Sequence, residues 1–210
     1  MLSADEIVEL HDQQTVLWHQ SPEREAGTDD SESGKTDDWL SAVARQHGAN
    51  FELWHIEDAA RTPGATDAEL AAVKRRVDQT NQRRNDLAEA LDRMLLDWLE
   101  ARGFPNPQAP LHSESPGLIV DRLSILALKI YHTREEAQRP DAPEGHAQRN
   151  RERLAILEEQ RSDLAGCLDV LWRQTLAGTR RFKLYRQLKM YNDPLLNPAV
   201  YRKLPNESAP

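Results

Sequence analysis

The sequence has only one cysteine, nine glycines and few aromatic side chains among its 210 residues. Cys167 has no partner for an internal disulfide, and a single cysteine cannot form a CxxC-type metal or redox site. We expect Cys167 to be a small core residue. The chain also lacks any run of about 18 apolar residues, which excludes a membrane-spanning helix. Its acidic start, M-L-S-A-D-E-I-V-E-L, has no apolar signal region, so the default location is cytoplasmic.

Basic residues are in the minority, with 27 Lys and Arg against 35 Asp and Glu and a net charge of −8. This balance argues against nucleic-acid binding. The charge is uneven: residues 1–69 hold sixteen acidic and four basic residues, whereas residues 170–210 hold two acidic and eight basic residues. Either the two ends of one domain attract each other, or the basic end receives an anionic ligand.

No stretch shows the alternation of a strand, and helical periodicity runs through most of the chain. It predicts helices over residues 4–20, 37–61 (interrupted near Gly48), 67–102 and 116–138, a fifth of about 30 residues ending at Ala177, and a short basic sixth over 179–191. The predicted fold is all-α: one domain, residues 1–210, with a single bundle of about five long antiparallel helices plus a short basic C-terminal helix. We expect residues 21–36 to be a mobile acidic loop and residues 193–210 a Pro-containing tail.

The stretch G-L-I-V-D-R-L-S-I-L-A-L-K-I-Y-H, residues 117–132, is the most apolar segment yet carries polar residues. On a helix, apolar side chains fill one face, and Asp121, Ser124, Lys129, Tyr131 and His132 share the other with Ile125 and Leu128. An amphipathic surface helix would have a solvated side. We therefore expect a central helix whose second face meets a polar core or a ligand pocket.

Asn81 and Arg84 interrupt the apolar stripe of the predicted helix 67–102. Buried polar side chains need partners, so these two belong either to a closed network or to a pocket. If residues 67–102 and 116–138 form a simple antiparallel hairpin, Arg84 lies level with about residue 134, beside Lys129 and His132. We therefore predict an anion-binding site of Asn81, Arg84, Lys129 and Lys189, with His132 as its general acid or base.

A second polar cluster is predicted from Asn50, Glu57 and Arg61, which share one helical face with Trp54. The simpler alternative is an ordinary ion pair between Glu57 and Arg61 at the surface. Asp121 is a further candidate for this cluster. The same hairpin model places Asn50 near residue 78, and it places Asp121 about 16 Å from His132 along the helix axis, which makes Asp121 a structural partner near the Pro-rich turn.

Metal-ligand spacing is weak. Glu52-x-x-His55 is half of a di-iron carboxylate pattern, and no second copy exists. The seven histidines show no HExxH motif and no i,i+4 pair on one helix. The sequence therefore predicts no metal and no cofactor.

The segments N-F-E-L-W-H-I-E-D-A-A-R, N-Q-R-R-N-D-L, I-V-D-R-L-S-I-L-A-L-K-I-Y-H and K-L-Y-R-Q-L-K-M-Y-N-D-P, spread over residues 45–195, together resemble a bacterial all-helical family of unknown function. Its members are often encoded beside cell-envelope glycosyltransferases. The resemblance implies a role in surface-glycan metabolism and brings no catalytic residues.

Two functions follow as hypotheses. The protein binds or acts on an anionic phosphorylated sugar or nucleotide-sugar, or it is a non-catalytic partner that docks on a glycosyltransferase through its basic C-terminal segment. A helical acid–base isomerase of the chorismate-mutase type is a third reading. Whether the protein is an enzyme, and whether it forms a homo-oligomer, stays open at this point.

Overall fold

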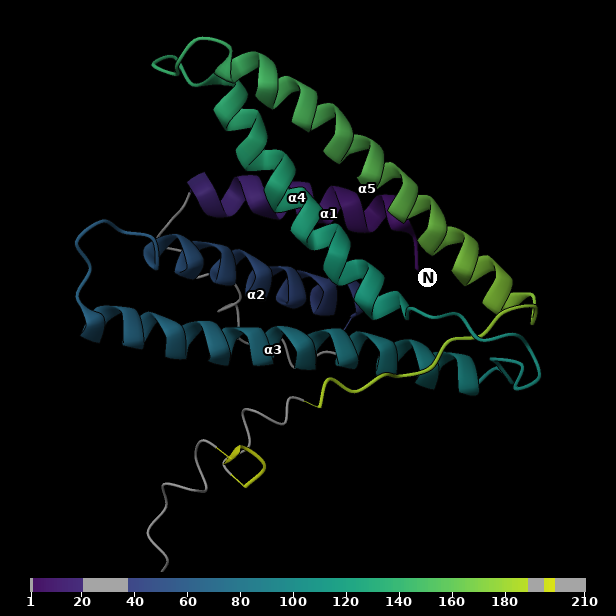
Figure 1. Cartoon of the computed structure of the whole chain (residues 1–210). Helices are drawn as coiled ribbons and strands as arrows, with labels where there is room; N and C mark the ends of the chain where they lie inside the picture. The colour runs from purple at the N-terminus through teal and green to yellow at the C-terminus, as the bar shows by residue number, and fades with distance from the viewer. Residues whose placement is uncertain (1, 21–37, 189–194, 199–210) are drawn as a thin grey trace, which may run out of the picture.

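The computed structural model describes residues 2–20, 38–188 and 195–198 (Figure 1). Its five helices confirm the all-α bundle: α1 (Ala4–Gln20), α2 (Trp39–Ala59), α3 (Asp67–Glu100), α4 (Pro116–Gln138) and α5 (His146–Leu176). The predicted bounds of α1 and α4 are confirmed to the residue. In the described part of the chain, no helix is both long enough and apolar enough to cross a membrane.

The helices form two antiparallel hairpins, α2–α3 and α4–α5, and α1 packs against α2, α4 and α5 (Figure 1). Helices α1, α2 and α4 run in broadly the same direction, while α3 and α5 run the opposite way. Helix α4 contacts all four other helices. This confirms the central position expected for residues 117–132, and it means that polar side chains on α4 meet other helices.

The core combines apolar residues of every helix, among them Ile7, Leu91, Leu123 and Leu168, each fully buried. On α1 the predicted inward face is partly wrong. Val16 and Leu17 are exposed, whereas the polar His11 and Thr15 are buried with Ile7 and Trp18. Hydrophobicity alone selected the wrong face because Thr15 is hydrogen-bonded to His47 of α2, and the ring of His11 packs against the ring of the same residue.

Helix α2 runs without interruption through Gly48, contrary to our expectation. Gly48 and its neighbours His47, Ala49 and Asn50 are buried. Tertiary packing on several sides overrides the modest cost of about 1 kcal/mol that glycine carries in a helix.

The start of α4 lies beside Ala88 and Asp92, more than two turns before the end of α3. The Asp92 carboxylate accepts a hydrogen bond from the Gly117 amide at 2.6 Å and another from the Ser115 hydroxyl. A Cβ atom on Gly117 would collide with the Ala88 carbonyl oxygen of α3. The last turns of α3 thus extend past α4, and the intervening connection folds back along them.

The predicted sixth helix is wrong over residues 179–188, the part of it that the structure describes. Gly178, with φ +69°, follows the end of α5, and its carbonyl accepts a hydrogen bond from Asn106. Beyond it, the chain is held extended against the α3–α4 connection: the Arg181 carbonyl accepts from the His112 amide at 2.7 Å, and Phe182 is buried. The backbone bonds to the connection replace those of a helix.

Candidate metal centre

Arg84 of α3 forms a bidentate ion pair with Asp121 of α4. Its Nε donates to Asp121 Oδ1 at 2.7 Å and its Nη2 to Oδ2, and the side chains are 22% and 10% exposed. Gln46 of α2 also donates to Asp121 Oδ1, at 2.6 Å. The hydrogen bond with Asp121 is the main cause that raises the pKa of Arg84. Arg84 is therefore held by protein carboxylate, and of the two alternatives for this residue the structure shows a network.

The predicted neighbours of Arg84, Lys129 and His132, are wrong. Our hairpin model assumed that α4 begins level with the end of α3, but α4 begins beside Ala88 and Asp92. Arg84, one turn before Ala88, consequently lies level with Asp121.

A chain of hydrogen bonds continues from Asp121 into α2 and α1. Asn50 Nδ2 donates to Asp121 at 3.0 Å and to the Ser124 hydroxyl at 2.9 Å. Ser124 Oγ lies 2.7 Å from His47 Nδ1, and His47 Nε2 lies 2.9 Å from the Thr15 hydroxyl. We call the side chains of Arg84, Asp121, Gln46, Asn50, Ser124, His47 and Thr15 the buried polar network.

The directions of the bonds at His47 follow from Thr15 and from the charge of the ring. Thr15 Oγ1 donates to the His11 carbonyl at 2.7 Å, so it accepts from His47 Nε2. Complete burial lowers the pKa of His47 to about 3, which makes the imidazole neutral. Its Nδ1 therefore accepts from the Ser124 hydroxyl.

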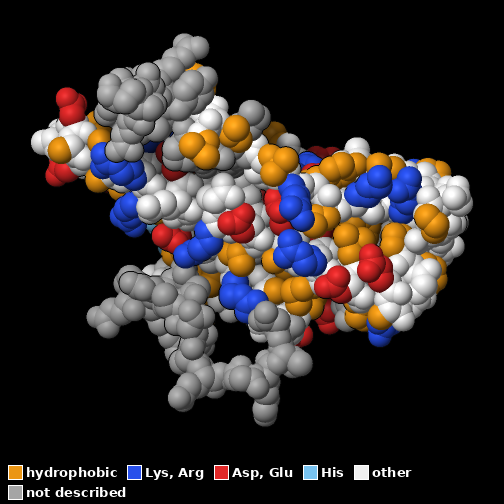
Figure 2. Space-filling view, turned by 90° about the horizontal axis from the view of Figure 1, so that it is seen from below, with side chains coloured by type: hydrophobic (Ala, Val, Ile, Leu, Met, Phe, Trp, Pro, Cys, Tyr) orange, Lys and Arg blue, Asp and Glu red, His pale blue; other side chains and the backbone are white. Residues whose placement is uncertain are grey.

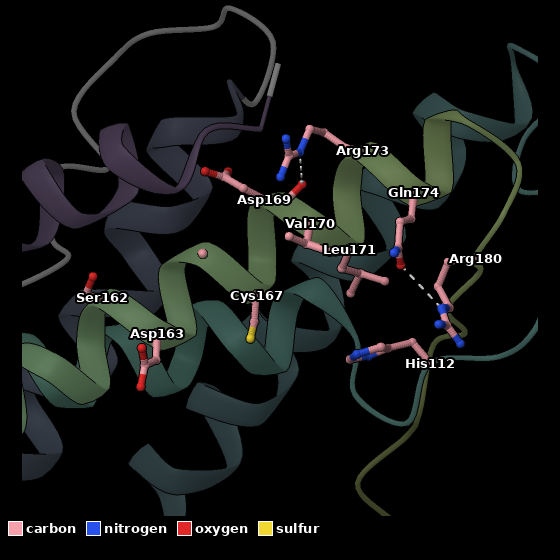
Figure 3. A pocket seen from close by; sticks show the side chains of 11 residues that line it. His112, Ser162, Asp163, Cys167, Asp169, Val170, Leu171, Arg173, Gln174 and Arg180 are labelled. Atoms are coloured by element: carbon pink, nitrogen blue, oxygen red, sulfur yellow. Dashed lines mark hydrogen bonds between the residues drawn. The ribbon is translucent and has the colours of Figure 1, made fainter.

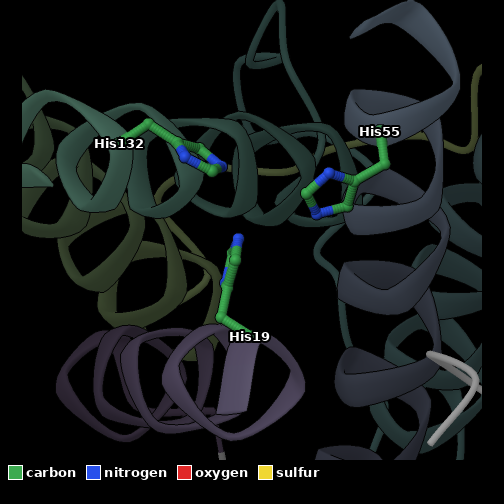
Figure 4. Close-up of side chains that lie close together, drawn as sticks. All are labelled: His19, His55 and His132. Atoms are coloured by element: carbon green, nitrogen blue, oxygen red, sulfur yellow. The ribbon is translucent and has the colours of Figure 1, made fainter. Parts of the chain in front are cut away.

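A second cluster lies further along the same three helices. His19 of α1, His55 of α2 and His132 of α4 face one another (Figure 4), and each offers a ring nitrogen within 4.8 Å of the other two. We call these residues the three-histidine cluster. His19 and His132 are partly buried, and His55 is exposed at the solvent side.

The outer nitrogens of two rings are fixed by hydrogen bonds. His19 Nδ1 lies 2.7 Å from the Thr15 carbonyl oxygen, and His132 Nδ1 lies 3.0 Å from Glu135 Oε2. Both partners accept, so each Nδ1 carries the proton and each Nε2 keeps its lone pair. Both Nε2 atoms are shielded from solvent and have no hydrogen-bond partner among the residues that the structure describes. Metal-binding histidines show this arrangement, with one nitrogen donated to a carbonyl or carboxylate and the other on the ion.

The surroundings of His55 and His132 favour the neutral form of these two rings. Burial, followed by repulsion from His19 and His132, lowers the pKa of His55, while Asp58 and Glu135 act in the opposite direction. Burial is also the main cause that lowers the pKa of His132. Neutral imidazole is the form that binds a metal ion. The two nearby carboxylates would balance the charge of a divalent cation.

Aromatic side chains support the cluster. The Trp54 ring stacks on His132 at 4.8 Å with an angle of 7°, and the Tyr131 ring stacks on His19 at 4.2 Å. The Phe51 edge contacts His55, with ring centroids 4.5 Å apart. Burial and the hydrogen-bonded carboxylate of Glu135 raise the pKa of Tyr131. Such packing restricts the imidazole rings to few orientations.

Three imidazoles and one open position are the donor set of many catalytic zinc sites. At a zinc–nitrogen distance of about 2.1 Å, tetrahedral ligand nitrogens lie about 3.4 Å apart. Small rotations of the rings would bring the three nitrogens from within 4.8 Å of one another to that separation. The exposed side of His55 leaves room for a water or substrate oxygen in the fourth position.

The residues of the predicted anion-binding site do not form one site in the structure. His132 lies in the three-histidine cluster, and Lys129 is exposed. Asn81 accepts from Arg84 at 3.5 Å beside the buried polar network. Lys189 lies outside the described residues.

The second predicted cluster divides in two. Asn50 and Asp121 are hydrogen-bonded in the buried polar network. Glu57, in the last turn of α2, forms an exposed pair with Arg61 just beyond the helix end, which is the surface pair expected as the alternative. Asn50 does not lie near residue 78: two residues after it, Glu52 pairs with Arg83 and accepts from Thr80. Residues of α2 therefore lie opposite later residues of α3 than the hairpin model assumed, which places Asn50 near Arg84 and Asp121.

The sequence reasoning missed His19 and His47, and it considered His55 only as half of a di-iron pattern. Spacing rules find ligands on one helix, whereas each ligand of the three-histidine cluster comes from a different helix. One pattern could have indicated the three-histidine cluster: among the seven histidines, only His19, His55 and His132 follow a large aromatic residue, in L-W-H, L-W-H and I-Y-H.

A separate hollow of about 650 Å³ lies along α5, opposite His112 and Arg180 (Figure 3). Cys167 lines it and is exposed, so its predicted core position is wrong. Both signs of charge line the hollow, and Arg173 and Arg180 already donate to α5 groups, at 3.4 Å each. It includes no residue of the three-histidine cluster.

One family model, described as a protein of unknown function, DUF4254, matches residues 40–184. The matched range includes His55 and His132 and excludes His19. No curated protein and no solved structure matches the chain.

Proposed function

The chain belongs to the DUF4254 family, whose description assigns no activity. From the geometry of the three-histidine cluster, we propose that the protein binds a divalent transition-metal ion through His19, His55 and His132. The observation that carries the proposal is the pair of shielded Nε2 atoms of His19 and His132. They lie close to His55 and have no hydrogen-bond partner in the described part of the chain. A buried polar atom without a partner is costly, and a metal ion would satisfy both.

Zinc is the ion that best fits three nitrogen donors in a tetrahedral arrangement. With the fourth position open, the ion would bind and polarise an oxygen atom of a ligand. The anionic phosphorylated sugar or nucleotide-sugar expected from the sequence would then contact the ion through a phosphate oxygen. Arg84 is not needed for this contact, since Asp121 already balances its charge.

The test is zinc titration of the chelator-treated full chain, prepared without a histidine tag. We expect one ion per chain, a raised melting temperature and, with cobalt(II) as the probe, the visible spectrum of a tetrahedral site. His55→Ala should lose the binding because His55 is a proposed ligand, and its exposure makes folding of the variant secure. His112→Ala is the matched control, since the side chain of His112 is hydrogen-bonded locally, to the backbone of Glu114, and the variant keeps the His112 amide. Equal zinc affinity in His55→Ala and His112→Ala would refute the proposal.

The anionic-ligand part has its own readout. Inorganic phosphate and a panel of nucleotide-sugars are added to the cobalt-loaded protein. A ligand that enters the open position changes the cobalt spectrum and raises the melting temperature of loaded protein only. If no phosphorylated compound changes either quantity, the protein binds metal without this ligand class.

The second candidate function is docking on a glycosyltransferase, and the exposure of Lys183 and Arg186 on the extended segment after α5 favours it. Figure 2 shows Lys and Arg side chains interspersed with apolar and acidic ones over one face, as a protein-binding surface would have them. Co-purification with a transferase, lost when Lys183 and Arg186 are changed to Glu, is the expected result. Retained co-purification would exclude this segment.

A further inference from the structure

We infer that the buried polar network is a positioning layer for the three-histidine cluster, and that Thr15 and His47 are the residues that connect the two; this inference rests on the metal-binding function proposed above. Neither residue is a proposed ligand. They would act through His19, by fixing α1 against the two helices that carry the other ligands.

The network and the cluster occupy successive levels of the same helices. From the network to the cluster, α2 and α4 each advance by eight residues, about 12 Å, and α1 advances by one turn. Each of these helices contributes to both levels, and the corresponding side chains are His47 and His55, Ser124 and His132, and Thr15 and His19.

Thr15 contacts both levels directly. Its hydroxyl is bonded to His47 Nε2 at 2.9 Å, and its backbone carbonyl accepts the Nδ1 proton of His19 at 2.7 Å. A rotation of α1 that breaks the first bond also moves the carbonyl that orients the ring of His19. Partners that orient a metal ligand in this way affect metal affinity about 10- to 100-fold.

The network permits one arrangement only. His47 is bonded at both ring nitrogens, and its neutral state fixes which neighbour donates. His47 also packs between the rings of His11 and Trp18, at 4.5 and 5.2 Å. A buried polar group with fixed partners specifies one register between helices, and here that register sets the distances among His19, His55 and His132.

Thr15→Val tests the inference, with Thr175→Val as its matched control. Both threonines are buried and donate to the carbonyl four residues earlier, Thr15 at 2.7 Å and Thr175 at 2.9 Å. Only Thr15 is bonded to a histidine. The zinc dissociation constant of the metal-free full chain is measured by competition with a chelating dye, the coordination geometry by the cobalt(II) spectrum, and the stability by urea unfolding.

We expect Thr15→Val to bind zinc about 10- to 100-fold more weakly with a changed cobalt spectrum, while Thr175→Val keeps wild-type affinity and spectrum. Thr15→Ser, which keeps the hydroxyl, should restore both. If Thr15→Val does not fold, Ser124→Ala replaces it, because it removes the donor to His47 from α4. Wild-type zinc affinity in Thr15→Val, or in Ser124→Ala where it replaces Thr15→Val, would overturn the inference. A wild-type protein that binds no zinc would instead refute the proposed function itself.

Discussion

Asp92 is a buried carboxyl group whose protonation should be visible in the stability of the protein. Burial raises its pKa to about 6, against the hydrogen bonds from Ser115 and Gly117, which lower it. Because the folded-state pKa lies above the unfolded value of 3.8, protonated Asp92 favours the folded state below pH 4. This contribution is lost as the pH rises from 4 through 6.

The variant Asp92→Asn cannot titrate, so it isolates this effect. Relative to the variant, the wild type should lose about 2 kcal/mol of unfolding free energy between pH 4 and pH 7. Urea unfolding of both proteins at several pH values measures the difference. A difference that does not change with pH would mean that Asp92 titrates alike in the folded and unfolded chains.

At the residue scale, sequence reasoning identified polar side chains that need partners but not the partners themselves. Arg84 and Asp121 were both expected inside the bundle, and both are there. Their pairing depends on where α4 begins beside α3, which no local pattern encodes. The third ligand, His19, lies on a helix joined to α2 by a long connection, so nothing in its neighbourhood of the sequence relates it to His55 or His132.

At the scale of elements, the contact between α3 and α4 depends on Gly117. A Cβ atom there would lie 2.9 Å from Asp92 Cγ and would overlap the Ala88 carbonyl oxygen. Gly117→Ala should therefore destabilise the protein by about 1–3 kcal/mol, even though alanine is the better helix former. In α5, a Cβ on the exposed Gly166 meets nothing within 4 Å, and Gly166→Ala should stabilise by up to about 1 kcal/mol. Urea unfolding measures both, and equal effects would contradict the close approach.

Helix ends were more predictable than helix packing because their causes are local. Pro116 after Ser115, and Gly178 after α5, mark boundaries that the structure confirms. The prediction of a sixth helix was wrong for a non-local reason. His112 and Asn106, from the distant α3–α4 connection, donate hydrogen bonds to the backbone carbonyls of Arg181 and Gly178. A helical pattern of charges in residues 179–188 could not reveal those bonds.

At the scale of the molecule, the buried histidines between α1 and α2 and the buried Asp92 between α3 and α4 respond to acid in opposite directions. The pKa values of His11 and His47 are lowered, chiefly by burial. Histidines that are neutral in the fold but titrate near 6.5 when unfolded add stability above pH 6.5, and this stability is lost as the pH falls. Asp92 acts in the other direction over part of the same range.

We expect the unfolding free energy of the metal-free protein to fall between pH 7 and pH 5, by about 2 kcal/mol from His47 and further from His11, with about 1 kcal/mol returned by Asp92. Urea unfolding in the presence of a chelator measures the sum.

In His47→Gln the loss should be smaller by about 2 kcal/mol, whatever the stability of the variant at pH 7. Zinc should enlarge the loss in the wild type, because protons compete with the ion for the three ligands. An acid response that neither His47→Gln nor zinc alters would mean that these helices do not hold their histidines neutral.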